Sequence, residues 1–75
     1  MQLSDVLIRI DEMPDESEQD QLVEQLRSLE GVIGSRFSLE KDHFMFVSYN
    51  SDTIKSTALL DKVKEHGFKA QLVGL

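Results

Sequence analysis

Apolar residues recur at strand or helix spacing in six successive segments, and the order of these segments constrains the fold. Along residues 3–10, Val6, Ile8 and Ile10 alternate with polar positions, which predicts a strand covered mainly on one side. Helical spacing of apolar residues, closed by glycine, predicts the two helices. The expected elements are strands at 3–10, 32–39, 43–49 and 68–73 and helices at 17–29 and 54–63, with a hairpin turn at 40–42 and turn and cap chemistry at 50–52.

The strand-helix-strand-strand-helix-strand order is typical of the ferredoxin-like fold, an α+β sandwich in a single domain over residues 1–75. Right-handed crossovers give a four-stranded antiparallel sheet of order 4-1-3-2 with both helices on one face. The loop after the first strand then lies beside the turn before the last strand. We therefore expect residues 11–20 to face His66, Gly67 and Phe68.

Net charge is concentrated in ten residues. The chain carries −6 overall, and residues 11–20 hold six acids and no base, whereas the rest balances eight acids against eight bases. Such a cluster before an amphipathic segment indicates either a helix start or a loop that faces a cation. The six acids are Asp11, Glu12, Asp15, Glu16, Glu18 and Asp20.

Composition excludes several classes of protein. With 75 residues and no cysteine, the core must be small and held by packing alone, without disulfides or thiolate metal sites. The acidic balance argues against nucleic-acid partners and anionic membranes. No apolar run is long enough to span a membrane, and residues 1–5 lack the start of a secretion signal, so we expect a cytoplasmic location without membrane insertion.

Several motifs resemble the heavy-metal-associated (HMA) domain, the fold of copper chaperones and of N-terminal modules of metal-pumping ATPases. That family has a Met-x-Cys-x-x-Cys loop, a Gly-Val pair after the first helix, a valine-and-tyrosine third strand and a second helix ending in Gly-Tyr or Gly-Phe. The counterparts in this chain are Met13, Gly31-Val32, Val47-Ser48-Tyr49 and residues 59–68.

The resemblance fails at the metal ligands, so the chain looks like a degenerate member of that family. The two cysteine positions of the family fall on Asp15 and Glu18. Because soft Cu(I) selects thiolates, copper binding is not expected. The resemblance also implies that Met13 packs under the loop as core.

Asp15 and Glu18 have two interpretations, which the sequence leaves open. They have the spacing of a capping box, and Ser17 with Asp20 offers the same pattern two residues later. Alternatively, Asp15 and Glu18, with His66 from the second helix and Glu16 or Asp11 in support, would form a hard or borderline cation site suited to Zn²⁺. A weakly bound divalent ion is the one cofactor left open. In the other interpretation, His66 is a C-terminal helix residue whose partial charge favours the helix dipole.

The segment 43–49 is similar to the third strand of the RNA-recognition motif, but it lacks that motif's basic-glycine pair, and an RNA-binding role ranks third. Alternation along it puts Phe44 and Phe46 on one face, and we expect that face to be the open one, with Leu7 and Leu72 nearby. Two interpretations stay open: an apolar patch for a partner or for self-association, or aromatics covered by Lys and Arg stems.

No nucleophile-base pair, phosphate loop or reactive thiol is present, so enzymatic activity is not expected. The sequence predicts a small binding or adaptor module whose acidic loop docks a protein with a basic surface, and a homo-oligomer through the open sheet face is a further expectation. The alternative is a noncysteine divalent-metal carrier using Asp15, Glu18 and His66. The expected partner-binding residues are Asp11, Glu12, Asp15, Glu16, Glu18, Phe44 and Phe46.

Overall fold

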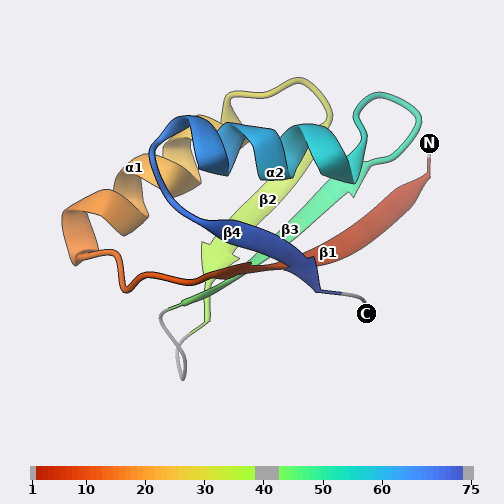
Figure 1. Ribbon diagram of the computed structural model, residues 1–75. Helices are drawn as coiled ribbons and strands as arrows, with labels where there is room; N and C mark the ends of the chain where they lie inside the picture. Colours follow the sequence, from red (N-terminus) through yellow and green to blue (C-terminus); the bar gives the residue numbers. More distant parts are fainter. Residues whose placement is uncertain (1, 39–42, 74–75) are drawn as a thin grey trace.

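Two helices cover one face of a four-stranded antiparallel sheet in the computed structural model, which describes residues 2–38 and 43–73 (Figure 1). The strand order is β2-β3-β1-β4, so the predicted order 4-1-3-2 is confirmed. The expected turn at 40–42 and the end of the second predicted strand, Leu39, lie outside the described residues. The elements are β1 (Leu3–Ile10), α1 (Glu16–Arg27), β2 (Val32–Phe37), β3 (Phe44–Asn50), α2 (Ser56–Glu65) and β4 (Ala70–Val73).

The core lies between the sheet and the helices, and the pairing of β1 with β3 builds its floor. Ile8 is opposite Met45 and Val6 is opposite Val47, so alternate residues of both central strands point toward the helices. All four are buried. The complete buried apolar set is Val6, Ile8, Ile10, Leu22, Leu26, Met45, Val47, Tyr49, Leu59, Val63 and Ala70.

Each helix buries a narrow apolar stripe of two residues one turn apart. Leu22 and Leu26 face the sheet from α1, and Leu59 and Val63 do so from α2. Within the described residues, no helix is long and apolar enough to cross a membrane.

The start of α2 differs from the prediction that residues 50–52 cap it. The helix begins at Ser56, and its N-cap residue Lys55 makes no side-chain capping bond. Asn50 instead holds the preceding turn, because its Oδ1 accepts from the Asp52 N–H (3.0 Å) and its Nδ2 donates to Thr53 Oγ1 (3.1 Å). The polar cluster is therefore turn chemistry, displaced from the helix start.

Two glycines adopt positive φ after the helices, but their surroundings differ. Gly31 (φ 97°) follows α1, and a Cβ there would lie 3.0 Å from Ile54 Cγ2 and from two atoms of Thr53. Gly67 (φ 89°) follows α2, and a Cβ there would meet nothing within 4 Å. Both positions favour glycine for its backbone, and Gly31 also keeps the α1–β2 turn close to the start of α2.

We predict that Gly31→Ala destabilises the fold more than Gly67→Ala does. Both variants bear the left-handed backbone cost of roughly 1–2 kcal/mol. Gly31→Ala adds the overpacking cost, typically about 1–3 kcal/mol, because Thr53 and Ile54 must move. Urea unfolding of the two variants and the native chain measures both free energies. Equal losses would show that the close approach at Gly31 carries no stability.

Candidate functional site: the acidic loop and the open sheet face

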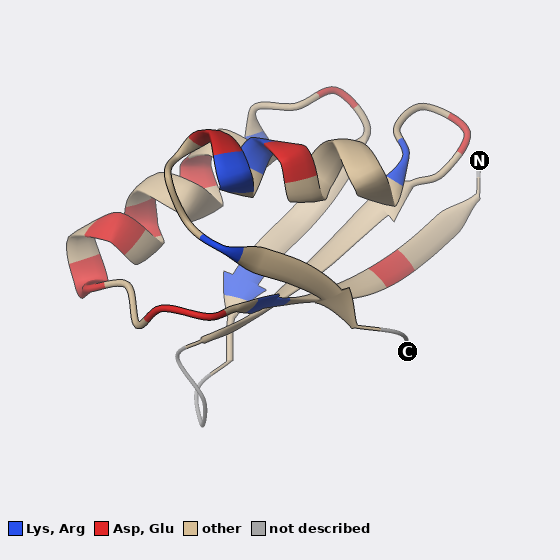
Figure 2. Cartoon of the chain, viewed as in Figure 1, with Lys and Arg blue, Asp and Glu red and all other residues tan. Residues whose placement is uncertain are grey.

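The acidic loop, defined as residues 11–15 with the first turns of α1 to residue 20, begins where β1 ends and lies against the segment that enters β4. Figure 2 shows acidic residues along this loop and along α1. The Asp11 N–H donates to the Lys69 carbonyl (2.8 Å), and the Lys69 N–H donates to Glu12 Oε1 (3.0 Å). The expected proximity of this loop to the α2–β4 connection is therefore confirmed, with Lys69, the residue after Phe68, making the contacts.

Asp15 and Glu18 form a reciprocal capping box at the start of α1. Asp15 Oδ1 accepts from the Glu18 N–H (2.8 Å), and Glu18 Oε1 accepts from the Asp15 N–H (3.0 Å). Both carboxylates also lie at the positive end of the helix dipole. Asp15 is the N-cap, so the alternative cap at Ser17 is wrong.

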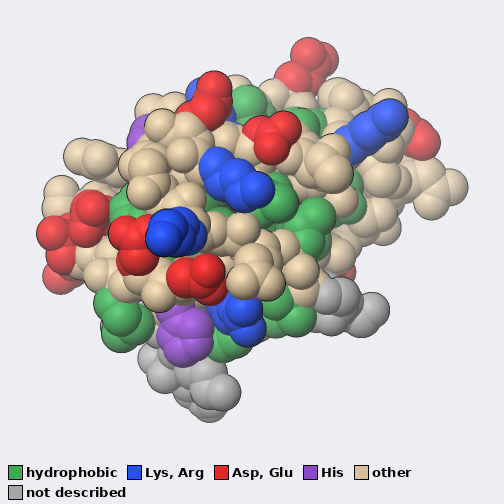
Figure 3. Space-filling model, viewed as in Figure 1, with side chains coloured by type: hydrophobic (Ala, Val, Ile, Leu, Met, Phe, Trp, Pro, Cys, Tyr) green, Lys and Arg blue, Asp and Glu red, His purple; other side chains and the backbone are tan. Residues whose placement is uncertain are grey.

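The other four acids of the loop divide into two pairs. Asp11 pairs with Arg9 (Nε to Oδ1, 3.5 Å), both side chains being about two-fifths exposed, and Glu12 accepts from the Lys69 N–H. Glu16 and Asp20 are exposed, and their side chains make no hydrogen bond or ion pair to another described residue. In Figure 3, which has the view of Figure 1, acidic side chains gather at the end of the molecule where α1 begins. The acidic loop thus combines a bonded framework with two free carboxylates.

The prediction that Met13 packs under the loop is wrong. Met13 is 69% exposed, whereas its neighbour Pro14 is buried. Proline has no N–H to leave unsatisfied on burial, and its carbonyl accepts from Gln19 Nε2 (3.1 Å), so Pro14 takes the inner position beside the N-cap. As a result, the Met13 side chain is exposed on the surface of the acidic loop.

The proposed metal ligands are not assembled into one cluster. Over residues 2–38 and 43–73, no three His, Asp or Glu side chains form a group that could hold a metal ion. Asp15 and Glu18 are adjacent but bond to each other's backbone, and His66 is the C-cap of α2. The structure therefore brings together two of the three predicted ligands, in a capping role.

Alternation in β3 is as predicted. Met45, Val47 and Tyr49 are buried, while Phe44 and Phe46 are half-buried on the opposite, open face of the sheet. There the Arg36 guanidinium lies over the Phe46 ring, 4.7 Å from its centroid. At Phe46 the structure thus favours the interpretation of an aromatic covered by an arginine.

Leu72 does not lie on the open face as predicted. It pairs with Ile8 and packs against the core, while Val73 pairs with Leu7. The prediction assigned Leu72 to the wrong face of the sheet, because the pairing of β4 with β1, which puts Leu72 beside the buried Ile8, is not visible in the sequence of β4 alone.

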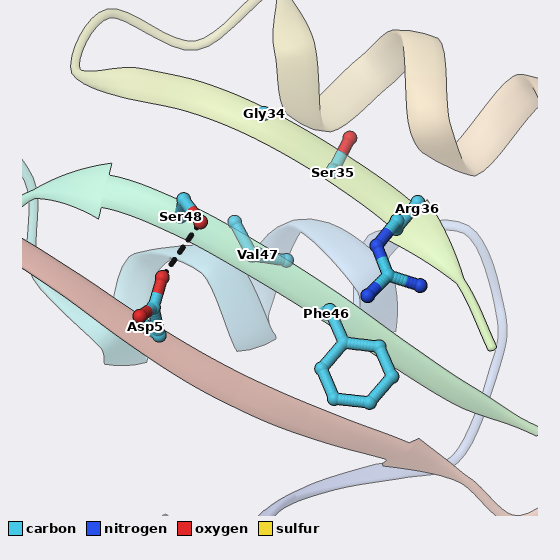
Figure 4. Close-up of a pocket in the computed structure, with 7 residues that line it drawn as sticks. All are labelled: Asp5, Gly34, Ser35, Arg36, Phe46, Val47 and Ser48. Atoms are coloured by element: carbon cyan, nitrogen blue, oxygen red, sulfur yellow. Dashed lines mark hydrogen bonds between the residues drawn. The ribbon is translucent and has the colours of Figure 1, made fainter.

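A shallow pocket of about 350 Å³ on the open face was not anticipated from the sequence (Figure 4). Its rim contains Asp5 and Ser48, joined by a hydrogen bond from Ser48 Oγ to Asp5 Oδ1 (2.6 Å), and the stacked pair Arg36 and Phe46. Gly34 leaves the space between them open, since nothing lies within 4 Å of its Cβ direction. The sequence signal was a glycine inside a strand, which accompanies a bulge between Val32 and Gly34.

We predict that Asp15→Ala lowers the free energy of unfolding by about 0.5–2 kcal/mol, because the Glu18 N–H loses its acceptor. Asp15→Ser keeps a capping oxygen and should recover most of the loss. Glu16→Ala, one residue on, removes the same charge type without a bond and serves as the matched control. Thermal or urea unfolding at neutral pH gives the three values. If Glu16→Ala costs as much as Asp15→Ala, the effect is general charge and the capping bond is not its cause.

No protein-family model and no curated protein sequence matches this chain. Solved structures do. The N-terminal domain of a potential copper-translocating P-type ATPase from Bacillus subtilis, in its Cu(I)-loaded state, superposes with a TM-score of 0.86 at 20% identity, covering 97% of this chain and 90% of that one.

Two further solved structures have the same arrangement. Oxidized MerP from Ralstonia metallidurans CH34 gives a TM-score of 0.85 at 12% identity, covering 97% of this chain and all of that one. A CopZ metallochaperone gives 0.82 at 16% identity, covering 91% and 100%. The resemblance drawn from the sequence motifs is confirmed at the level of the fold: this chain has the ferredoxin-like fold of the heavy-metal-associated domains, without their cysteines.

Proposed function

We propose that this chain is a non-enzymatic binding module that docks a basic protein surface through the acidic loop. The observation that carries the proposal is that some acids of the loop bond to the backbone, whereas others are exposed and unbonded. Asp15 and Glu18 hold the helix start and Glu12 bonds to Lys69, so the loop is ordered, while Glu16 and Asp20 stay exposed and without partners among the described residues. An ordered display of free carboxylates suits charge-steered recognition.

Met13 gives this surface an apolar centre. It is 69% exposed and lies between the acidic pairs Asp11-Glu12 and Asp15-Glu16 in the chain. Protein interfaces combine an apolar centre with a polar rim, and methionine is a flexible side chain that adapts to a partner. The expected partner therefore presents an apolar depression with Lys or Arg around it.

The resemblance to metallochaperone-like domains supports docking at the acidic loop, since it implies that partners are recognised at the end of the fold that holds the loop after β1. Copper chemistry is not carried over, because the chain has no cysteine. The proposal includes a single-domain module working in the cytoplasm, which a core stabilised without disulfides supports. The open sheet face, with Phe44 and Phe46, is its second contact surface, with a second copy of the chain as the expected occupant.

Neutralising the free carboxylates should weaken docking without weakening the fold. We predict that Glu16→Gln combined with Asp20→Asn reduces capture of basic partners by the immobilised chain, because steering and rim pairing are lost. Capture by the native chain should also fall as salt rises from about 0.05 M to about 0.5 M, where the screening length shrinks. Quantitative mass spectrometry of the captured proteins, with unfolding measured in parallel, gives both results.

The matched control for docking is Glu24→Gln with Asp61→Asn, which removes two exposed charges from the helices and so has the same net charge as the Glu16→Gln, Asp20→Asn variant. Proteins retained by this control but lost from the Glu16→Gln, Asp20→Asn variant are partners of the acidic loop. If both variants lose the same proteins to the same extent, net charge governs capture and docking at the acidic loop is wrong.

A divalent-metal carrier would use the same carboxylates, but Asp15 and Glu18 would have to give up their capping bonds. We therefore predict no saturable amide NMR shifts at residues 11–20 or His66 with micromolar Zn²⁺, Cu(I), Mn²⁺ or Ca²⁺. The displacement of two helix-capping bonds opposes binding, and His66 does not lie in a ligand cluster with them. Micromolar shifts that Asp15→Ala and Glu18→Ala abolish, with the helix still folded, would instead establish the carrier.

A further inference from the structure

The open face of the sheet carries opposite charges on the two sides of β3. On this face β3 runs between β1 and β2, so Asp5 and Arg36 lie on opposite sides of it. Asp5 pairs in register with Ser48, which also lies beside Gly34, and Arg36 lies beside Phe46, which pairs with Leu7. Opposite charges thus stand on opposite flanks of one aromatic strand, two residues apart along it.

We propose that this face is the interface with a second copy of the chain, related by a two-fold axis that runs along β3. Such an axis exchanges the β1 side with the β2 side, so Asp5 of each copy approaches the Gly34–Arg36 edge of the other. Phe46 lies on the axis, so the stacked Arg36 and Phe46 of one copy lie beside those of the second copy. The pair of chains then contains two equivalent contacts between Asp5 and Arg36.

Both charged groups are already oriented for these contacts. The Ser48 hydroxyl holds one oxygen of Asp5 at 2.6 Å and leaves the other available, and the Phe46 ring holds the Arg36 guanidinium at 4.7 Å. Neither Asp5 nor Arg36 forms an ion pair with another described residue. Groups held in place before binding lose less conformational entropy in forming a carboxylate-guanidinium pair.

Gly34 supplies the space that the arrangement needs. The pocket of about 350 Å³ extends from Asp5 to Arg36 across Gly34, where no side chain fills the surface (Figure 4). Sheets that pack face to face stand about 10 Å apart, so an incoming carboxylate side chain must find room at the opposing surface. The position opposite Asp5 under the proposed axis is the glycine.

A second copy fits this face better than the other occupants. A partner with one sign of charge is matched on only one flank of β3, and a small zwitterion in the pocket leaves the half-buried Leu7, Phe44 and Val73 uncovered. The described strands contain three charged residues, Asp5, Arg9 and Arg36, with two guanidinium groups against one carboxylate. The open face therefore lacks the excess of negative charge that opposes self-association elsewhere on this chain.

Sedimentation velocity from about 10 μM to about 1 mM protein tests the proposal. The native chain should dimerise in this range. Asp5→Arg and Arg36→Asp should each weaken the dimer at least tenfold, because like charges then face each other. An equimolar mixture of the two variants should form a heterodimer, since each introduced side chain meets its opposite. Asp61→Arg and Arg27→Asp, on the helices, change the charge equally and should leave the dimer unchanged.

Gly34→Val gives a second test that does not alter charge. A Cβ at this position meets nothing in the single chain, so the variant should fold, but its side chain occupies the space for Asp5 of the second copy. It should therefore be monomeric, with a native-like amide spectrum. A native chain that stays monomeric throughout the range, or variants that dimerise as the native chain does, would overturn the proposal.

This inference rests on the second contact surface of the proposed function, the open sheet face, and is independent of docking at the acidic loop; the variants separate the two. The Glu16→Gln, Asp20→Asn variant should dimerise as the native chain does. The monomeric Gly34→Val variant should still capture partners of the acidic loop. If one of the two proposals is wrong, these variants still test the other.

Discussion

The residue-by-residue pairing of β1 with β3 is the constraint from which the rest of the structure follows. Ile8 opposite Met45 and Val6 opposite Val47 give the helices an apolar floor. Because a strand has a period of two, the same register places Leu7 opposite Phe46 on the other side. One register therefore determines both the core and the open face of the sheet. A shift of β1 by one residue along β3 would move the core residues of β1 to the open face.

The capping box gives the acidic loop a structural role that is independent of the docking role proposed for it. The bonds of Asp15 and Glu18 fix the start of α1, and those of Asp11 and Glu12 fix the loop against Lys69. The family resemblance places cysteines at the positions of Asp15 and Glu18. In this chain carboxylates stand there and bond to the backbone of the first helical turn.

The sequence was sufficient for features set by strong local patterns. The alternation in β1 matches the strand at both ends. The helical spacing predicted α1 from residue 17, one residue after its observed start, while the choice between Asp15 and Ser17 as the N-cap stayed open. The sequence failed where two neighbours compete for one buried position, as with Met13 and Pro14, since the family resemblance favours the methionine, whereas the structure buries the proline. The parity of β4 depended likewise on pairing with β1.

The pocket on the open face shows why such sites escape analysis along the chain. Its lining comes from three strands, with Asp5 in β1, Gly34 and Arg36 in β2, and Phe46 in β3, and only the glycine is unusual within its own strand. Their relation appears only once β3 is placed between β1 and β2, because cross-strand register converts distant positions into neighbours. The acidic loop, contiguous in sequence, was visible from composition. A surface formed by residues from several strands can be recognised only when the order and register of the strands are known. To recognise that such a surface could pair with a second copy of itself, the symmetry axis that relates the two copies must be considered as well.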